Sequence, residues 1–370
     1  MYSSSRTYLL FAIVALVATL SVVASNGCHH SDLITTSPSD SSKNPVDTTH
    51  RLHSIDDSVA YSFVVMGCNR LDKGDVNLST NPSTANLAQL DRTFTDIYNL
   101  SPRPDYVILV GDLIIGKVTD SAQVGAQLRG WRAHYEASPL ASTGIKLVLV
   151  PGNHEFNDGT SSANCEQAWL NNLSPYIVGS NGPLPGGADA LATDQSRLSY
   201  SFDFHDAHFV LLNSDPLNAS ATIPATWVGQ DMATARAAGS KHIFVFAHKP
   251  AYSFDNSISN GLTQASRDAL WSAMSTNHAE AMFAAHNHIY KRQHPNNTSY
   301  MIIAGNGGSS LENPVGADNN FGFTRVCVLT SGHVVSRAYG RDSGPKYNDP
   351  SPAATYPTTV RDSVDITWAP

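Results

Sequence analysis

Five short segments of this chain combine a small residue with side chains that can bind a metal ion. Histidine, aspartate and asparagine supply the imidazole and oxygen donors that suit Zn, Mn or Fe, and a small neighbour lets the backbone approach closely. One such segment is weak evidence, because a lone histidine is more often a surface or hydrogen-bonded residue. Five in one chain, the last with two histidines, favour a metal centre. They are Gly67-Cys68-Asn69-Arg70, Gly111-Asp112, Pro151-Gly152-Asn153-His154-Glu155, Ala247-His248-Lys249-Pro250 and Ala285-His286-Asn287-His288.

Each segment directly follows an apolar run with the composition of a buried β-strand. These runs cover residues 61–67, 105–110, 145–150, 242–246 and 281–284. Helical periodicity lies between them, over residues 83–100, 121–137, 227–238 and 264–275, and further strand-like runs cover 200–204, 208–213, 299–304, 325–329 and 334–338. Alternating strands and helices predict an α/β fold with a helix-covered parallel sheet. Ligands of such sheets bind at the carboxyl ends of the strands, so we expect the five segments to meet there.

The order of these segments resembles the calcineurin-like metallophosphoesterases, a superfamily that includes purple acid phosphatases and phosphodiesterases. Gly111-Asp112, Gly152-Asn153-His154-Glu155, His248 and His286-Asn287-His288 appear in the order typical of that family. The resemblance runs from about Phe63 to Asn306. It implies a four-layer α/β/β/α sandwich of two packed mixed β-sheets flanked by helices. It also implies hydrolysis of phosphate mono- or diesters by a metal-bound hydroxide.

The resemblance assigns Asp112, Asn153, His248 and His286 to one metal ion. The second ion of the family uses the same aspartate, the final histidine (here His288), and an aspartate and a histidine of the first motif. This chain has Cys68 and Arg70 at those last two positions. The resemblance therefore implies one or two ions of Zn, Mn or Fe per chain.

Three interpretations of the altered first motif remain open. In the first, the Cys68 thiolate still binds a metal, and Arg70 grips the substrate phosphate through its planar fork. In the second, the site holds one metal, and Arg70 supplies positive charge in place of the other. In the third, the domain is a catalytically impaired binding module at the cell surface.

The resemblance also assigns roles to neighbouring residues. His154 matches the histidine that protonates the leaving oxygen, and Glu155 would orient it or a metal ligand. The expected substrate is a small-molecule phosphate ester. Lys249 and Arg292 lie near the site motifs, but isolated cations of this kind are more typical of a solvated surface. The chain has no His-Glu-x-x-His or Gly-x-Ser-x-Gly motif that would suggest a protease.

The amino terminus predicts export. Residues 1–27, with Arg6 before an apolar run, have the pattern of a signal peptide. Ser25-Asn26-Gly27-Cys28 resembles a bacterial lipoprotein cleavage site, so we expect membrane attachment through a lipidated Cys28. There are two alternatives. Cleavage after Ala24 would release a periplasmic or extracellular protein, and without any cleavage the segment would remain as an anchor. Residues 28–55 form a polar linker, 56–340 one domain, and 341–370 a loose tail.

The charge and cysteine content of the chain limit the classes of partner and of fold that we expect. The 370 residues carry 23 Lys and Arg against 31 Asp and Glu, a net charge of −8, without a basic block. Such a chain is not expected to bind nucleic acid. Apart from Cys28 there are three cysteines, an odd number that argues against a disulfide-based fold. Oligomeric state stays open.

Overall fold

The computed structural model describes residues 58–116, 121–156, 162–257, 260–312, 320–344, 346–349 and 355–368. The expected signal peptide, Cys28 and the linker lie outside these residues. No helix in the described part of the chain has the length and apolar character needed to span a membrane.

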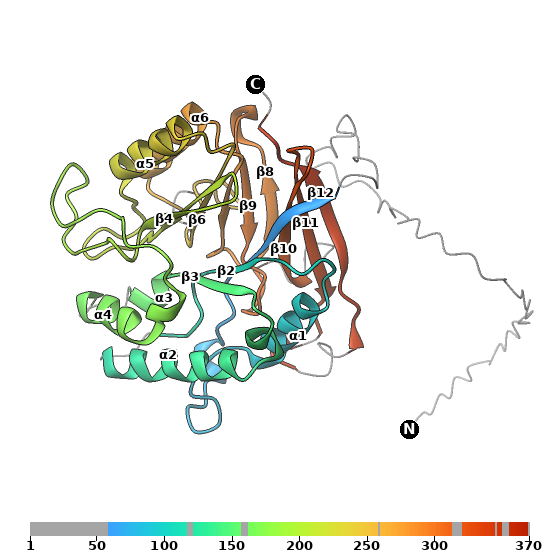
Figure 1. Cartoon of the computed structure of the whole chain (residues 1–370). Helices are drawn as coiled ribbons and strands as arrows, with labels where there is room; N and C mark the ends of the chain where they lie inside the picture. Colours follow the sequence, from blue (N-terminus) through green and yellow to red (C-terminus); the bar gives the residue numbers. More distant parts are fainter. Residues whose placement is uncertain are drawn as a thin grey trace, which may run out of the picture. The chain divides into compact units, whose positions relative to one another are not determined.

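Strands and helices alternate through most of the chain, as the sequence predicts (Figure 1). The strands are β1 Val59–Met66, β2 Tyr106–Val110, β3 Lys146–Val150, β4 Tyr200–Phe204, β5 Ala207–Leu212, β6 His242–Ala247, β7 Ala281–Ala284, β8 Tyr290–Gln293, β9 Tyr300–Ala304, β10 Asn320–Leu329, β11 Val334–Asp342 and β12 Thr359–Asp365. The helices are α1 Leu87–Tyr98, α2 Ser121–Glu136, α3 Asn153–Phe156, α4 Ser162–Leu173, α5 Ala225–Ala237 and α6 Gln264–Thr276.

The strands form two mixed six-stranded sheets, in the orders β12-β11-β10-β1-β2-β3 and β4-β5-β6-β7-β9-β8. In the first sheet β1, β2 and β3 are parallel, and in the second β5, β6, β7 and β9 are parallel. The register pairs Met66 with Leu109 and Val110 with Val150, so the carboxyl ends of these three strands lie at one edge. The same edge of the second sheet carries the ends of β6 and β7. Both sheets therefore present their strand ends to the candidate site.

The inner core lies between the two sheets and is rich in aromatic rings. Phe63 on β1 lies 5.0 Å from the ring of Phe244 on β6 and 5.9 Å from that of Phe283 on β7. Each fully buried Phe side chain contributes roughly 1.5–3 kcal/mol from removal of apolar area from water. Because successive side chains of a strand point to opposite faces, Val64 and Met66 face the other way, into an outer core with the helices.

Helices cover the outer face of each sheet. Apolar residues of α1, α2 and α4 pack on the sheet that contains β1, β2 and β3, and those of α5 and α6 pack on the other sheet. Figure 1 shows α1 and α2 at the bottom of the view and α5 and α6 at the top. The expected four-layer α/β/β/α sandwich is confirmed.

The expectation of a loose tail over residues 341–370 is wrong. β11 extends to Asp342, and β12 pairs with it in antiparallel register. Val364 and Ile366 are buried in the core between the sheets. The Pro, Thr, Ser and Asp content of the segment hides this strand, because only its last part alternates apolar and polar residues.

Helix α1 begins later than expected. Ser83 is not its N-cap: the Ser83 hydroxyl donates to Oδ1 of Asn81 and accepts from the Ala85 backbone. Asn86 is the N-cap, and its side chain accepts from the backbone N–H of Gln89. Both residue types are common caps, so the tertiary turn before the helix decides between them.

Candidate metal centre

The strand ends bring three buried ligand types together. One ligand atom from each of Cys68, Asp112 and His248 lies within 4.8 Å of the other two. Cys68 follows β1, Asp112 follows β2, and His248 follows β6. The cluster therefore joins the two sheets.

Asn153 and His286 complete this group of donors. Nε2 of His248 lies 3.2 Å from Oδ1 of Asp112 and 3.0 Å from Oδ1 of Asn153. Nδ1 of His286 lies 3.0 Å from the same Asn153 oxygen and 3.3 Å from Nε2 of His248. The structure thus brings all four residues of the first predicted metal site to one point.

These separations fit a single metal ion. Ligands bound to one transition-metal ion at about 2.0–2.2 Å lie about 2.8–3.1 Å apart at about 90° and about 3.3–3.6 Å apart in a tetrahedral site. Nδ1 of His248 donates to the carbonyl of Val110 at 2.8 Å, which fixes the ring and turns Nε2 toward the other donors. Two nitrogens and two oxygens are a donor set typical of Zn, Mn or Fe.

The charges of the cluster also favour one cation here. Burial alone would lower the pKa of His248, but Asp112 outweighs it and raises that pKa. Burial and the neighbouring His248 lower the pKa of His286 to about 3. Burial would raise the pKa of Asp112, yet His248, His154 and Arg70 hold it well below its usual range. Asp112 is therefore a carboxylate among nitrogen donors, as a metal site requires.

The backbone of the site is held in unusual conformations. Cys68, Asp112 and His286 have φ of 57°, 55° and 63°, in the left-handed region. Each such non-glycine residue costs on the order of 1–3 kcal/mol. Each of the three is the second residue after a strand end, where this backbone conformation turns the chain at the site.

Glycines allow the loops of the site to touch. A Cβ on Gly111 would lie 2.6 Å from the backbone of Gly152 and 2.6 Å from Nδ1 of His248. A Cβ on Gly152 would lie 2.4 Å from Oδ1 of Asp112. These small residues are therefore required by contact between the loops, as the sequence pattern suggests.

Glu155 clamps the loop that carries Asp112. Its Oε2 accepts from the backbone N–H of Asp112 at 3.0 Å and of Gly152 at 2.7 Å. Its Oε1 accepts from the next two N–H groups, those of Leu113 and Ile114, at 2.8 and 3.2 Å. Glu155 thus orients a predicted metal ligand through the backbone.

The opposite oxygen of Asp112 faces two further predicted site residues. Oδ2 lies 3.5 Å from Nε of Arg70 and 3.9 Å from Nε2 of His154. Nδ1 of His154 is 2.6 Å from the carbonyl of Ile115. Arg70 and His154 therefore lie together on the side of Asp112 away from the His248 donors.

His288 is buried beside the loop that follows β9. Its Nδ1 donates to the carbonyl of Ser310 at 2.7 Å. The same loop contacts the first motif, since Ser309 donates its N–H to the Cys68 carbonyl at 2.8 Å and its hydroxyl to that of Arg70 at 3.0 Å. The loop after β9, which begins Gly305-Asn306-Gly307-Gly308, thus holds the first motif in place.

Two expectations about surface cations are wrong. Lys249 is buried, and its Nζ donates to Asp215 at 2.6 Å and to Ser220 at 3.2 Å. Arg292 forms an ion pair with Asp362 on β12 at 2.7 Å. Sequence reasoning missed the partner of Lys249, although Asp215 follows a strand end in the same way as the other site segments.

Tyr347, in the segment expected to be loose, also binds the site loops. Its hydroxyl accepts from the Asp72 N–H and donates to Asp75, both at 2.7 Å. Its carbonyl accepts from the side chains of Asn86 at 2.9 Å and Gln89 at 3.3 Å. No sequence signal marks this residue, because each partner is remote along the chain.

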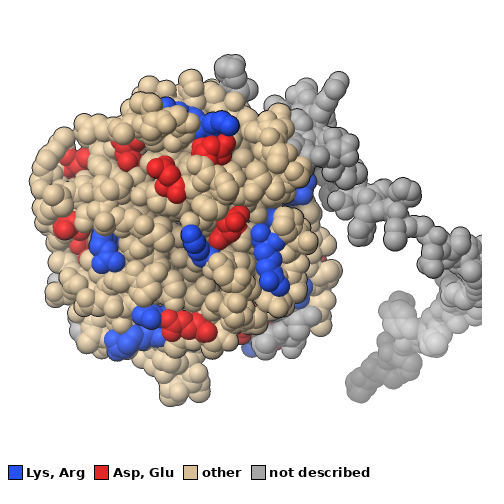
Figure 2. All heavy atoms as spheres, in the orientation of Figure 1, with Lys and Arg blue, Asp and Glu red and all other residues tan. Residues whose placement is uncertain are grey.

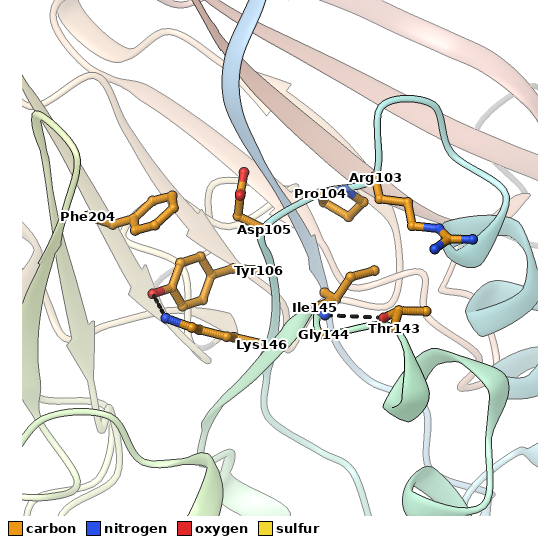
Figure 3. Close-up of a pocket in the computed structure, with 9 residues that line it drawn as sticks. All are labelled: Arg103, Pro104, Asp105, Tyr106, Thr143, Gly144, Ile145, Lys146 and Phe204. Atoms are coloured by element: carbon orange, nitrogen blue, oxygen red, sulfur yellow. Dashed lines mark hydrogen bonds between the residues drawn. The ribbon is translucent and has the colours of Figure 1, made fainter.

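A hollow of about 240 Å³ lies where β2 and β3 begin, at the opposite ends of these strands from the candidate metal centre (Figure 3). Its lining includes Tyr106 and Lys146, at the starts of β2 and β3, and Nζ of Lys146 lies 3.5 Å from the Tyr106 hydroxyl. Ligands of parallel sheets bind at the other end.

On the face drawn in Figure 2, charged side chains are sparse and both signs are interspersed.

Comparisons with known proteins agree with this fold. Residues 52–290 match the family model of the calcineurin-like phosphoesterases. A purple acid phosphatase from yellow lupin (Lupinus luteus) seeds shares the fold at a TM-score of 0.56 and 17% identity, over 82% of this chain and 53% of its own, so this chain spans about half of that protein. A dimetal phosphatase from Danio rerio matches at a TM-score of 0.54 and 14% identity, over 84% of this chain and 100% of its own. No curated protein matches by sequence.

Proposed function

This chain belongs to the calcineurin-like phosphoesterase family, and we propose that it is an exported enzyme that hydrolyses phosphate esters at a metal centre held by Asp112, Asn153, His248 and His286. The observation that carries this proposal is the set of four donor atoms, of whose six pairwise distances four are 3.0–3.3 Å. A bound Zn, Mn or Fe ion would acidify water and neutralise charge on the phosphoryl oxygens.

His154 is the proposed general acid. In the hydrolysis, water adds to phosphorus, the bond from phosphorus to the leaving oxygen breaks, and that oxygen takes a proton. A protonated imidazole donates from both nitrogens, so Nδ1 can hold the Ile115 carbonyl while Nε2 gives its proton to the leaving oxygen. Its place beside Asp112 and Arg70 supports this role.

Export is proposed on the signal-like residues 1–27 and on Cys28, a candidate for lipidation. The substrate proposed is a small phosphate ester, because the donors sit among buried loops and the site side chains suit a single phosphate group. The purple acid phosphatase and dimetal phosphatase with the same fold support the reaction class.

The test combines metal content with turnover on purified full-length protein. We expect bound metal and hydrolysis of at least one ester from a panel of phosphate monoesters and diesters. His248→Ala should lose both, whereas His134→Ala, which removes a partly exposed histidine paired with Asp91, should lose neither. Metal binding without turnover on the whole panel would favour a metal-containing binding module. Protein that binds none of Zn²⁺, Mn²⁺ or Fe²⁺ would refute the proposal.

A further inference from the structure

The two oxygens of the Asp112 carboxylate face different groups. Oδ1 faces Nε2 of His248 at 3.2 Å and accepts the backbone N–H of His154 at 3.1 Å. Oδ2 faces Nε of Arg70 at 3.5 Å. A carboxylate that bridges two cations can offer one oxygen to each. Here the second oxygen already faces a cation that belongs to the protein.

Arg70 is fixed in this position. Its side chain is only 14% exposed, and Nη1 lies 3.7 Å from Oδ1 of Asp72. Its backbone forms a bridge with Ala85, and its carbonyl accepts from the hydroxyl of Ser309. Nε is buried and, apart from the ion-pair contact with Asp112 at 3.5 Å, makes no hydrogen bond with the described residues. This donor is therefore able to bind an oxygen of a ligand.

Asp112 is the ligand that two metal ions would share, and Nε of Arg70 lies 3.5 Å from its Oδ2. The other residues left for a second metal ion are Cys68 and His288. Sγ of Cys68 already accepts the backbone N–H of His286 at 3.2 Å, and Nδ1 of His288 donates to the Ser310 carbonyl at 2.7 Å. The guanidinium therefore lies on the side of Asp112 that a second ion would need.

Resting on the proposed function, we propose that the guanidinium of Arg70 takes the place of a second metal ion: the centre holds one ion, and Arg70 binds the substrate phosphate opposite it. A cation held beside Asp112 disfavours a second one there by like-charge repulsion, which is strong for partly buried charges at close range. The planar fork of arginine matches phosphate oxygens, so it also supplies a substrate contact.

Elemental analysis, which counts metal atoms per chain, tests the first part of the proposal, that the centre holds one ion. Full-length protein is loaded with Zn²⁺, Mn²⁺ or Fe²⁺, desalted and counted. We expect about one metal per chain for wild type and for Cys68→Asp, in which Arg70 remains. The double variant Cys68→Asp/Arg70→His, which removes the guanidinium and adds two ligands, should bind about two. Arg361→His, on edge strand β12, is the matched control and should stay at one.

Two metals in wild type or in Cys68→Asp would overturn the proposal and leave the proposed function intact. One metal in a folded double variant, with wild-type circular dichroism and cooperative unfolding, would overturn it as well. No metal in wild type would instead defeat the proposed function on which it rests. The three failures are therefore distinguishable.

Binding of inorganic phosphate tests the second part of the proposal, that Arg70 contacts the substrate phosphate. This test does not require the double variant to fold. Calorimetry on metal-loaded protein should show at least about tenfold weaker binding for Arg70→Ala, because a charge-assisted contact is lost. Arg70→Lys should recover part of the loss, since lysine keeps the charge without the fork. An unchanged Kd for Arg70→Ala would show that the guanidinium makes no phosphate contact and would overturn this part.

Discussion

The backbone N–H of His286 donates to Sγ of Cys68 at 3.2 Å. Cys68 follows β1 in one sheet, and His286 follows β7 in the other. The sheets are close together here, since a Cβ on Gly67 would lie 2.5 Å from that of Ala285. The cysteine of the altered first motif thus connects the two halves of the site.

Cys68 is expected to act as a structural acceptor. Cys68→Ala leaves the His286 N–H without its partner and should lower the free energy of unfolding by about 1–3 kcal/mol, measured by denaturant titration. Cys327→Ala, which removes a buried thiol from β10, controls for the lost volume. Metal content should stay at one per chain in both variants. Loss of the metal in Cys68→Ala would instead identify the sulfur as a ligand.

Glu155→Gln should destabilise the loop of Asp112. A glutamine has one acceptor oxygen where the carboxylate has two, and its NH₂ group would face backbone N–H groups that now have an acceptor. We expect a loss of about 1–3 kcal/mol in thermal or denaturant unfolding and weaker metal binding. Glu136→Gln, at an exposed ion pair with Arg132, should change stability little. Similar effects for the two variants would argue against the clamp.

His154→Ala should affect esters according to their leaving groups. Alkyl phosphates need a proton on the departing oxygen, so their kcat should fall by about 10²–10⁴-fold. p-Nitrophenyl phosphate releases a stable anion and should lose less. The comparison is made by steady-state kinetics on one preparation. An equal loss for both ester types would assign His154 to positioning.

A histidine outside the site should make the free energy of unfolding fall as pH rises above about 6.5. His208 lies 2.7 Å from Asp203 and 2.9 Å from Asp231. Burial would lower the pKa of His208, but these carboxylates outweigh it and raise that pKa. The folded state therefore holds the proton more tightly than the unfolded chain, whose histidine titrates near 6.5. This stabilisation is complete below that pKa and is lost as pH rises through the folded-state pKa.

Urea unfolding at several values between about pH 6 and about pH 9 measures this dependence. His208→Gln, which has no charge to lose, should flatten this part of the stability profile. Equal pH profiles for the variant and the wild type would contradict the assignment to His208.

Tyr347→Phe should loosen the loop that follows Arg70. It removes the hydroxyl contacts with Asp72 and Asp75 and keeps the carbonyl contacts with α1. We expect about 0.5–1.5 kcal/mol lower stability, faster amide exchange over residues 71–76, and a higher KM with little change in kcat. Tyr356→Phe, at an exposed tyrosine, is the control. A lower kcat with unchanged KM would argue against a positioning role for Tyr347.

The sequence by itself determined the fold class and, through its resemblance to the phosphoesterase family, the candidate metal ligands. Asp112, Asn153, His248 and His286 each follow an apolar strand, and parallel strands in register must present their ends at one edge. This is local information: a run of apolar residues, a small residue and a polar one. It required no knowledge of which strands are neighbours.

Only the tertiary structure decided where the residues of the altered first motif lie. The place of Arg70 beside Asp112, the contact of Cys68 with His286, and the Lys249–Asp215 pair all join segments remote in sequence. Such contacts depend on how closely the two sheets pack and on side-chain directions, which strand periodicity does not encode. The order of motifs therefore predicts where the site lies, and packing between the sheets determines which charges fill it.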